Sequence, residues 1–241
     1  MSRSILVIPD THVPYHDRDA LALVYKVMRA CKPDVTVLIG DFADFYAASH
    51  FPKSPTRRQD LEYEVESVNL ELDRIQALSK EVVYLEGNHE WRLERYLTQK
   101  APELFGLVQC KELFKIKKRG WRWIPYHDHA LIGKVLFAHD LGHAGKWAAL
   151  NTLAAAGECA VFGHTHRGSV MYGGTVGGEH RVVMNVGWLG DPLQVDYMHR
   201  AKTRDWQHGF GWIHMERSGL AWMSFCPIVK GQVAVEGRLF K

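Results

Sequence analysis

The chain has 241 residues, 46% of them hydrophobic, which is enough to bury a substantial core within one domain spanning residues 1–241. The 30 Lys and Arg residues exceed the 27 Asp and Glu residues by only three, too small a surplus to indicate nucleic-acid binding by itself. Four scattered cysteines without a CxxC pair, no signal peptide and no run of roughly 20 apolar residues predict a cytoplasmic protein without a membrane partner.

The first part of the chain alternates short apolar runs with amphipathic segments, a pattern typical of an α/β protein. The apolar runs are continuous and rich in β-branched residues, as expected for parallel strands that are buried on both faces. We expect strands at residues 4–8, 35–39 and 82–85, and helices at residues 19–29, 59–80 and 90–99.

The second part has more strands and more glycine turns. The pair Gly133-Lys134 predicts a tight turn between two of these strands. Residues 145–156 are rich in alanine and predict a helix. We expect strands at residues 121–124, 130–132, 134–138, 160–162, 181–186, 210–215, 220–225 and 232–235.

Five of the predicted strands are each followed directly by a polar cluster. Loops beyond the carboxyl ends of strands converge in open α/β sheets, so these clusters are expected to meet at one rim. The clusters contain carboxylates, an amide and several imidazoles, and they are Asp10-Thr-His12, Gly40-Asp41-Phe-Ala-Asp44, Gly87-Asn88-His89-Glu90, His139-Asp140 and Gly163-His164-Thr165-His166.

This donor set predicts a site for two divalent metal ions. Imidazole and carboxylate donors without thiolate suit Mn, Fe, Zn, Ni or Co better than Mg or Ca, and we expect Mn²⁺. Two such ions about 3.5–4 Å apart need an anionic bridge, and Asp41 lies in the middle of the set. With two carboxylates and a hydroxide, a net positive charge remains, which favours an anionic phosphoester as substrate.

In order and spacing, the motifs D-x-H, GD-x-x-D, GNHE, a strand-terminal His and GHTH resemble those of the calcineurin-like metallophosphoesterase superfamily. The resemblance covers the loops from Asp10 to His166. It implies a four-layer α/β/β/α sandwich of two mixed β-sheets flanked by helices. It also implies that one metal is held by Asp10, His12, Asp41 and His166, and the other by Asp41, Asn88, His139 and His164.

The resemblance also implies two catalytic residues outside the metal ligands. His89 would bind the phosphate or protonate the leaving oxygen, and Asp44 would orient His89. The implied reaction is in-line attack by a metal-bridging hydroxide. Taken singly, Asp10 and Asp41 could be helix caps and His139 a core histidine, and His143 is a rival for the role of His139.

The sequence departs from the family's protein phosphatases at two positions. These enzymes carry arginines directly after GD-x-x-D and directly before GNHE, whereas this chain has Phe45 and Glu86. Without this clamp on a dianionic monoester, we expect a phosphodiesterase, with nucleases among the candidates. The alternatives are a phosphomonoesterase for a small metabolite or a phosphoprotein and, less favoured, a non-catalytic binding scaffold.

Several residues near the motifs are candidates for contacts with a phosphodiester substrate such as DNA or RNA. The basic run from Lys115 to Arg119 fits either a nucleic-acid surface or a solvated turn. The C-terminal part of the chain has four aromatic residues, Trp188, Tyr197, Trp206 and Trp212. They could line a substrate groove or a dimer face, but packing of the second sheet is the favoured interpretation. The candidate substrate-binding residues are Arg57, Arg58, Arg92, His143 and Arg167.

Overall fold

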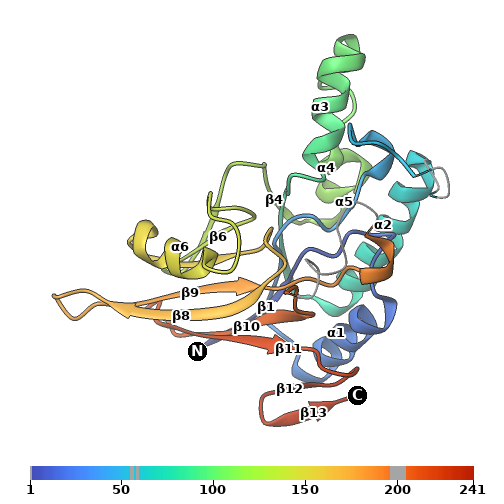
Figure 1. Cartoon of the computed structure of the whole chain (residues 1–241). Helices are drawn as coiled ribbons and strands as arrows, with labels where there is room; N and C mark the ends of the chain where they lie inside the picture. The colour runs from blue at the N-terminus through green and yellow to red at the C-terminus, as the bar shows by residue number, and fades with distance from the viewer. Residues whose placement is uncertain (1, 55–56, 58–59, 196–204) are drawn as a thin grey trace.

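The computed structural model describes residues 2–54, 57, 60–195 and 205–241. Two mixed β-sheets lie face to face, with helices α1 (Arg18–Cys31) and α2 (Leu61–Leu78) outside the first sheet and α6 (Ala148–Ala156) outside the second (Figure 1). The predicted four-layer α/β/β/α sandwich is therefore confirmed.

The first sheet has six strands in the order β11-β10-β1-β2-β3-β4. Strands β1 to β4 run parallel, with β4 at one edge. Beside β1, strand β10 pairs antiparallel with β1, and β11 pairs antiparallel with β10. The strands are β1 (Arg3–Ile8), β2 (Val35–Leu38), β3 (Glu81–Leu85), β4 (Arg122–Ile124), β10 (Gly209–Met215) and β11 (Ala221–Pro227).

The second sheet has five strands in the order β5-β6-β7-β9-β8, of which β6, β7 and β9 are parallel. The strands are β5 (Ala130–Ile132), β6 (Val135–Ala138), β7 (Cys159–Phe162), β8 (Gly168–Gly174) and β9 (His180–Val186). Gly133 and Lys134 form the turn between β5 and β6, as predicted. Strands β12 (Val233–Val235) and β13 (Arg238–Phe240) form a separate hairpin.

Alternate residues of the parallel strands enter two different cores. In β1, Ile5 and Val7 pack between the two sheets, whereas Leu6 and Ile8 pack against the helices. Burying each such side chain contributes about 1.5–3 kcal/mol, so both faces of the strand favour the same register. This two-sided burial explains why the run is continuously apolar rather than alternating.

The helices begin and end close to the predicted positions. Asp17 caps α1 by accepting hydrogen bonds from two backbone amides, and Asp60 caps α2 in the same way through one. Helix α3 (Trp91–Lys100) extends away from the sheets in Figure 1. The shorter elements are α4 (Cys110–Leu113), α5 (Ile116–Arg119) and the 3₁₀ turns η1 (Tyr46–Ala48), η2 (Pro102–Leu104) and η3 (Pro192–Gln194).

The basic run from Lys115 to Arg119 forms a short helix rather than a turn, and its three lysines are exposed. Ile116 is buried, and the Arg119 guanidinium lies 2.7 Å from Asp73 on α2. Helix α5 is held to α2 through Arg119, which also donates to Asn69 Oδ1 at 3.1 Å. Within the described ranges, no helix is long and apolar enough to cross a membrane.

Candidate metal centre

Five strands deliver polar side chains to one rim of the molecule. Strands β1, β2 and β3 end there in the first sheet, and β6 and β7 end there in the second. Because the parallel strands of each sheet share one direction, their following loops meet where the two sheets adjoin. The structure brings together all seven residues predicted as metal ligands, in two adjacent groups.

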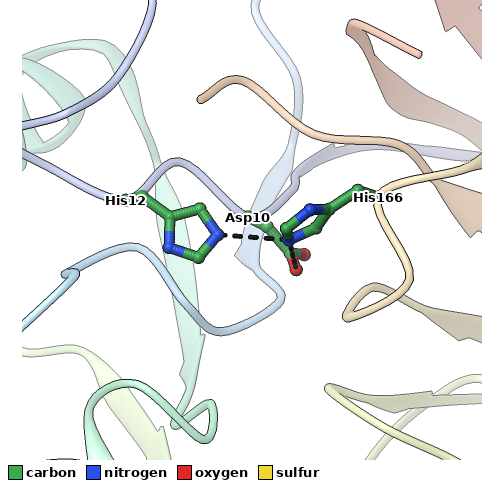
Figure 2. Close-up of side chains that lie close together, drawn as sticks. All are labelled: Asp10, His12 and His166. Atoms are coloured by element: carbon green, nitrogen blue, oxygen red, sulfur yellow. Dashed lines mark hydrogen bonds and ion pairs between the residues drawn. The ribbon is translucent and has the colours of Figure 1, made fainter. Parts of the chain in front are cut away.

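The first group consists of Asp10, His12 and His166. The Nε2 atoms of His12 and His166 lie 3.2 Å apart, and His166 Nε2 lies 3.2 Å from Asp10 Oδ2. Figure 2 shows the three side chains pointing toward one another, although they come from the loops after β1 and β7. Their donor atoms therefore surround one point.

The second group consists of Asp41, His139 and His164, with Asn88 beside them. Asn88 Oδ1 lies 3.0 Å from His139 Nε2 and 2.8 Å from His164 Nδ1. The same Nε2 atom of His139 lies 3.4 Å from Asp41 Oδ1. One carboxylate, one amide oxygen and two imidazoles thus converge from four different loops.

Asp41 lies between the two groups. Its carboxylate also lies within reach of His12 and His89, which together with Asp41 form a third set of close donors. Burial opposes ionisation of Asp41, but the surrounding imidazoles of His139, His89 and His12 outweigh burial and hold its pKa well below the usual range. This central anionic position is the one expected of a bridging ligand.

The unsatisfied atoms of the first group fit a divalent cation. Asp10 Oδ2 is fully buried and, apart from the approach of His166 Nε2, has no hydrogen-bond partner among the described residues. A buried carboxylate oxygen in this condition is unfavourable unless a cation compensates it. The two facing Nε2 atoms of His12 and His166 supply lone pairs toward the same point, so the donor set suits a metal of the Mn-to-Zn series.

The backbone around these ligands is strained. Four of them, His12, Asp41, His164 and His166, have φ between 50° and 65°, a left-handed conformation that few residues other than glycine adopt. Such strain costs on the order of 1–3 kcal/mol per residue and concentrates at functional sites. In the loop after β7, two residues with this conformation, His164 and His166, reach different donor groups.

The glycines of the motifs are required by close approach to ligands. A Cβ at Gly87 would lie 2.2 Å from Asp41 Oδ1, and a Cβ at Gly163 would lie 2.4 Å from Asp10 Oδ1. Each glycine therefore lets one ligand loop pack directly against the carboxylate of another. This is a physical reason for the G-N and G-H pairs in the motifs.

His89 is held by Asp44 and Arg92 beside the ligands. His89 Nδ1 lies 3.1 Å from the Asp44 backbone oxygen, and His89 Nε2 lies 2.8 Å from the Arg92 guanidinium. Asp44 also lies 3.3 Å from His12, and its pKa is lowered because His12 and His89 outweigh the effect of burial. Burial and the neighbouring Arg92 lower the pKa of His89, although Asp41 opposes this effect.

Arg92 has a different environment from the one predicted. We expected a substrate contact, but its guanidinium is buried and donates to the Asp44 backbone oxygen at 3.0 Å. Arg92 is the second residue of α3, and its backbone amide donates to the His89 carbonyl oxygen at 3.1 Å. In this structure Arg92 therefore orders His89 and Asp44 rather than facing open solvent.

Glu90 is a site residue that the sequence did not single out. Its fully buried carboxylate accepts hydrogen bonds from the backbone amides of Asp41, Ala43 and Gly87, all at 2.9 Å, and from the Tyr84 hydroxyl at 2.8 Å. Burial and the nearby Asp41 raise its pKa to about 7. Glu90 joins the loops after β2 and β3, and its place in the motif GNHE was the available signal.

The other predicted substrate residues have differing positions. Arg57 lines a cavity together with His12, Asp44 and His166, and its guanidinium lies 3.8 Å from the Tyr15 ring centre. Arg167 donates to the Thr165 backbone oxygen at 3.1 Å, and His143 is half-buried in the loop after β6. Arg58 lies outside the described residues.

Two tail tryptophans lie at the site, which sequence reasoning did not favour. Trp188 stacks on His166 with ring centres 5.1 Å apart, and Trp206 contacts the same ring edge-on at 4.2 Å. Trp212 instead packs in the core beneath the helices, and Tyr197 lies outside the described residues. Trp206 is partly exposed and suits the substrate-groove interpretation, whereas Trp188 is only 2% exposed and packs beneath it.

The two positions that lack arginine are filled by buried side chains. Phe45 stacks on Phe114 with ring centres 5.8 Å apart, inside the helix-side core. Glu86 is buried, accepts a hydrogen bond from the Tyr126 amide at 3.1 Å, and has a pKa raised by burial to about 7. Neither residue brings a positive charge to the metal centre.

Comparison with known proteins gives one family match and several distant relatives. A family model described as calcineurin-like phosphoesterase matches residues 3–224. Two proteins named gene 54 protein, from Mycobacterium phage D29 and Mycobacterium phage L5, are each 28% identical over 265 aligned residues that cover both chains completely.

Solved structures with a similar fold share little sequence. Vps29 from Cryptosporidium parvum has 14% identity and a TM-score of 0.48, covering 99% of this chain and 94% of its own. The Escherichia coli phosphoesterase Yfce has 13% identity and a TM-score of 0.43, covering 92% of this chain and 98% of its own.

Proposed function

The chain belongs to the calcineurin-like phosphoesterase family, and from this premise we propose that it hydrolyses phosphodiesters with the help of two divalent metal ions. The family match and the His/Asp groups support a metal-dependent phosphoester hydrolase. The observation that carries the proposal is the pair of converging donor groups that meet at Asp41, with no arginine at the two positions that clamp a monoester.

The two metal ions would be held by the two groups. Asp10, His12 and His166 would hold one, Asn88, His139 and His164 the other, and Asp41 would contribute to both. We propose Mn²⁺ because nitrogen and oxygen donors are mixed, with Fe, Zn, Ni and Co as alternatives. When bound, such ions withdraw electron density from a phosphoester and lower the pKa of coordinated water.

The residues around the ligands would position the substrate and move a proton. We assign protonation of the leaving oxygen to His89 Nε2, because Nδ1 is directed to the Asp44 backbone oxygen. Arg92 can only donate to Nε2, so this role requires the guanidinium to move away and Nε2 to take up a proton before it can pass that proton to the leaving oxygen. Arg57, at the cavity next to the first group, would offset the single charge of a diester.

The charges near the site favour a diester over a monoester. A monoester dianion needs more neutralisation than a diester monoanion, and guanidinium groups usually supply it. Here Phe45 and Glu86 supply none. A scaffold without catalysis is disfavoured because every residue type of the donor set is present and converges.

Hydrolysis of two chromogenic esters by Mn-loaded protein tests the proposal. We expect kcat/KM for bis-p-nitrophenyl phosphate to exceed that for p-nitrophenyl phosphate by at least about tenfold, equivalent to roughly 1.4 kcal/mol, and EDTA to abolish both activities. Faster hydrolysis of the monoester would establish the phosphomonoesterase alternative. A metal-loaded protein that cleaves neither ester would support the scaffold.

The natural substrate and location belong to the same proposal. DNA and RNA are the candidate phosphodiester partners, because cations and aromatic side chains adjoin the site. The cysteines in the described ranges are free, as expected in a reducing compartment, and the cytoplasmic location stays a prediction.

A further inference from the structure

Two sets of aromatic side chains flank the candidate metal ligands, one beside each donor group. We propose that they stack the bases on either side of the scissile phosphate of a single-stranded nucleic acid. This inference rests on the proposed phosphodiesterase function, because it places the phosphate at the metal centre.

The first aromatic set lies beside the Asp10–His12–His166 group. Trp206 lies edge-on to both His166 and Trp188, with ring centres at 4.2 Å and 4.8 Å, and it is only partly buried. Trp206 and Trp188 line the same cavity as Arg57 and Tyr15, but Trp188 is only 2% exposed, so Trp206 is the ring of this pair that a base can reach. A cation and a partly exposed indole therefore lie next to the point on which the first donor group converges.

The second aromatic set lies beside the Asp41–His139–His164 group. Tyr126 lies 6.2 Å from His139 between ring centres, and it packs on Trp91 at 5.6 Å and on His127 at 3.9 Å. Arg95 lies 5.5 Å from the Trp91 ring centre. This set, like the first, combines partly exposed rings with one arginine.

The placement of the two sets matches the shape of a nucleic-acid strand. A phosphodiester has two ester arms, and in a strand each arm leads to a nucleoside whose base has a π-face. One aromatic set contacts His166 of the first donor group, and the other contacts His139 of the second. A diester bound at the centre would therefore meet one aromatic set with each arm.

The requirement for stacking selects single strands. Bases in a duplex are paired and stacked on each other, so they reach a side-chain ring only after unstacking, whereas bases of a single strand stack freely and with little sequence preference. The basic run on α5 is an alternative nucleic-acid surface with three exposed lysines, but it lies beside α2, whereas the aromatic rings contact donor histidines. The aromatic sets are thus the better candidates for substrate binding.

Binding of a fluorescein-labelled phosphorothioate dT10 to Mn-loaded protein, followed by fluorescence anisotropy, tests the inference without requiring turnover. We expect Trp91→Ala and Trp206→Ala each to weaken binding by about 5- to 100-fold, as is usual when a stacking aromatic is removed. Trp222→Ala is the matched control. Trp222 is 52% exposed and pairs with His214 at the end of the first sheet opposite the metal centre. Trp91→Leu keeps an apolar side chain but lacks the π-face, and separates stacking from folding.

Unchanged dT10 affinity in both Trp91→Leu and Trp206→Ala would overturn the inference, as would equal affinity of the wild-type protein for a duplex of the same length. Hydrolysis of bis-p-nitrophenyl phosphate is measured on the same preparation. Diester hydrolysis without dT10 binding would refute only the inference and point to a small diester. Tryptophan-dependent dT10 binding without hydrolysis would refute only the proposed function.

Discussion

Asp34 and Asp41 lie beyond opposite ends of the same strand, β2, in the first sheet. The side chain of Asp34 is 37% exposed and lies 2.8 Å from the Lys80 ammonium group. The side chain of Asp41 is 2% exposed and is surrounded by histidines of four other loops. Both carboxyls have pKa values below the usual range, but for different physical reasons.

The difference shows how the same residue type serves stability at one end of the strand and metal binding at the other. Lys80 and Ser4 complete the surroundings of Asp34 with a full cation and with hydrogen bonds. The surroundings of Asp41 provide imidazoles, whose lone pairs can turn to a metal ion. Substitutions at the two ends should therefore affect different properties. A change of Asp41 should affect activity, and a change of Asp34 should affect stability.

The largest effect is expected from Asp41→Asn. The neutral amide cannot offset the repulsion between two dications, so we expect metal content to fall and diester hydrolysis to drop by at least about 10³-fold. Metal analysis after dialysis and hydrolysis of bis-p-nitrophenyl phosphate are the measurements. Full metal content in the folded variant would refute the assignment of Asp41 as the shared ligand, and Asp34→Asn is the matched control with normal activity.

His89→Ala tests whether His89 is a metal ligand or transfers a proton without binding a metal. If His89 transfers a proton without being a ligand, the variant should keep both metals and lose turnover by about 10²–10⁴-fold. Metal content and kcat are measured together on one preparation. A variant that loses a metal ion would show that the close set of His12, Asp41 and His89 is itself a ligand group.

Arg92→Ala tests the cation that lies nearest to His89. Arg92 donates to His89 and to the Asp44 backbone oxygen, so its loss should misplace the imidazole and lower kcat by about 10–100-fold, less than removal of His89. Arg92→Lys should recover only part of this activity, because one ammonium group cannot make both contacts with the same geometry. An increase in KM with unchanged kcat would instead show that Arg92 binds substrate.

The metal ligands could be predicted because each one directly follows a buried strand in a spaced motif. Parallel strands carry such residues to one end of each sheet, but Asp10 and His166 follow strands of different sheets and meet because the two sheets pack face to face. Trp188 and Trp206 belong to no motif, and their position follows from the path of the chain between β9 and β10. The direction of Arg92 depends on how α3 starts, which hydrophobic periodicity does not specify.

One short helix and one strand were also beyond the sequence pattern. Helix α5 has four residues, too few for a helical repeat to show, and its stability comes from the burial of Ile116 and the contact between Arg119 and Asp73. Strand β8 has a partly exposed pattern with three glycines, so its pairing with β9 rather than its own composition defines it. In both cases tertiary contacts outweigh local preference.

The smallest effect is expected at the other end of β2, from Asp34→Asn. The hydrogen bond from Lys80, followed by the bond from the Ser4 amide, lowers the pKa of Asp34 to about 2, below the value of about 3.9 in an unfolded chain. A carboxyl with a lowered pKa stabilises the fold above its unfolded pKa, and this contribution disappears as the pH falls through the folded value. Because Asp34 is more than one-third exposed, solvent screening limits the contribution to less than about 1 kcal/mol.

Thermal unfolding of the wild-type protein and Asp34→Asn between pH 6 and pH 2.5 measures this contribution. The variant should have a lower Tm at pH 6, by no more than about 2–4 °C, and the two curves should approach each other between about pH 4 and pH 2. Hydrolysis of the small diester at pH 7 should be the same for both proteins, because Asp34 lies at the end of β2 opposite the metal centre. A loss of metal in Asp34→Asn would remove the contrast between the two ends of β2. It would show that the surface ion pair between Asp34 and Lys80 also supports metal binding.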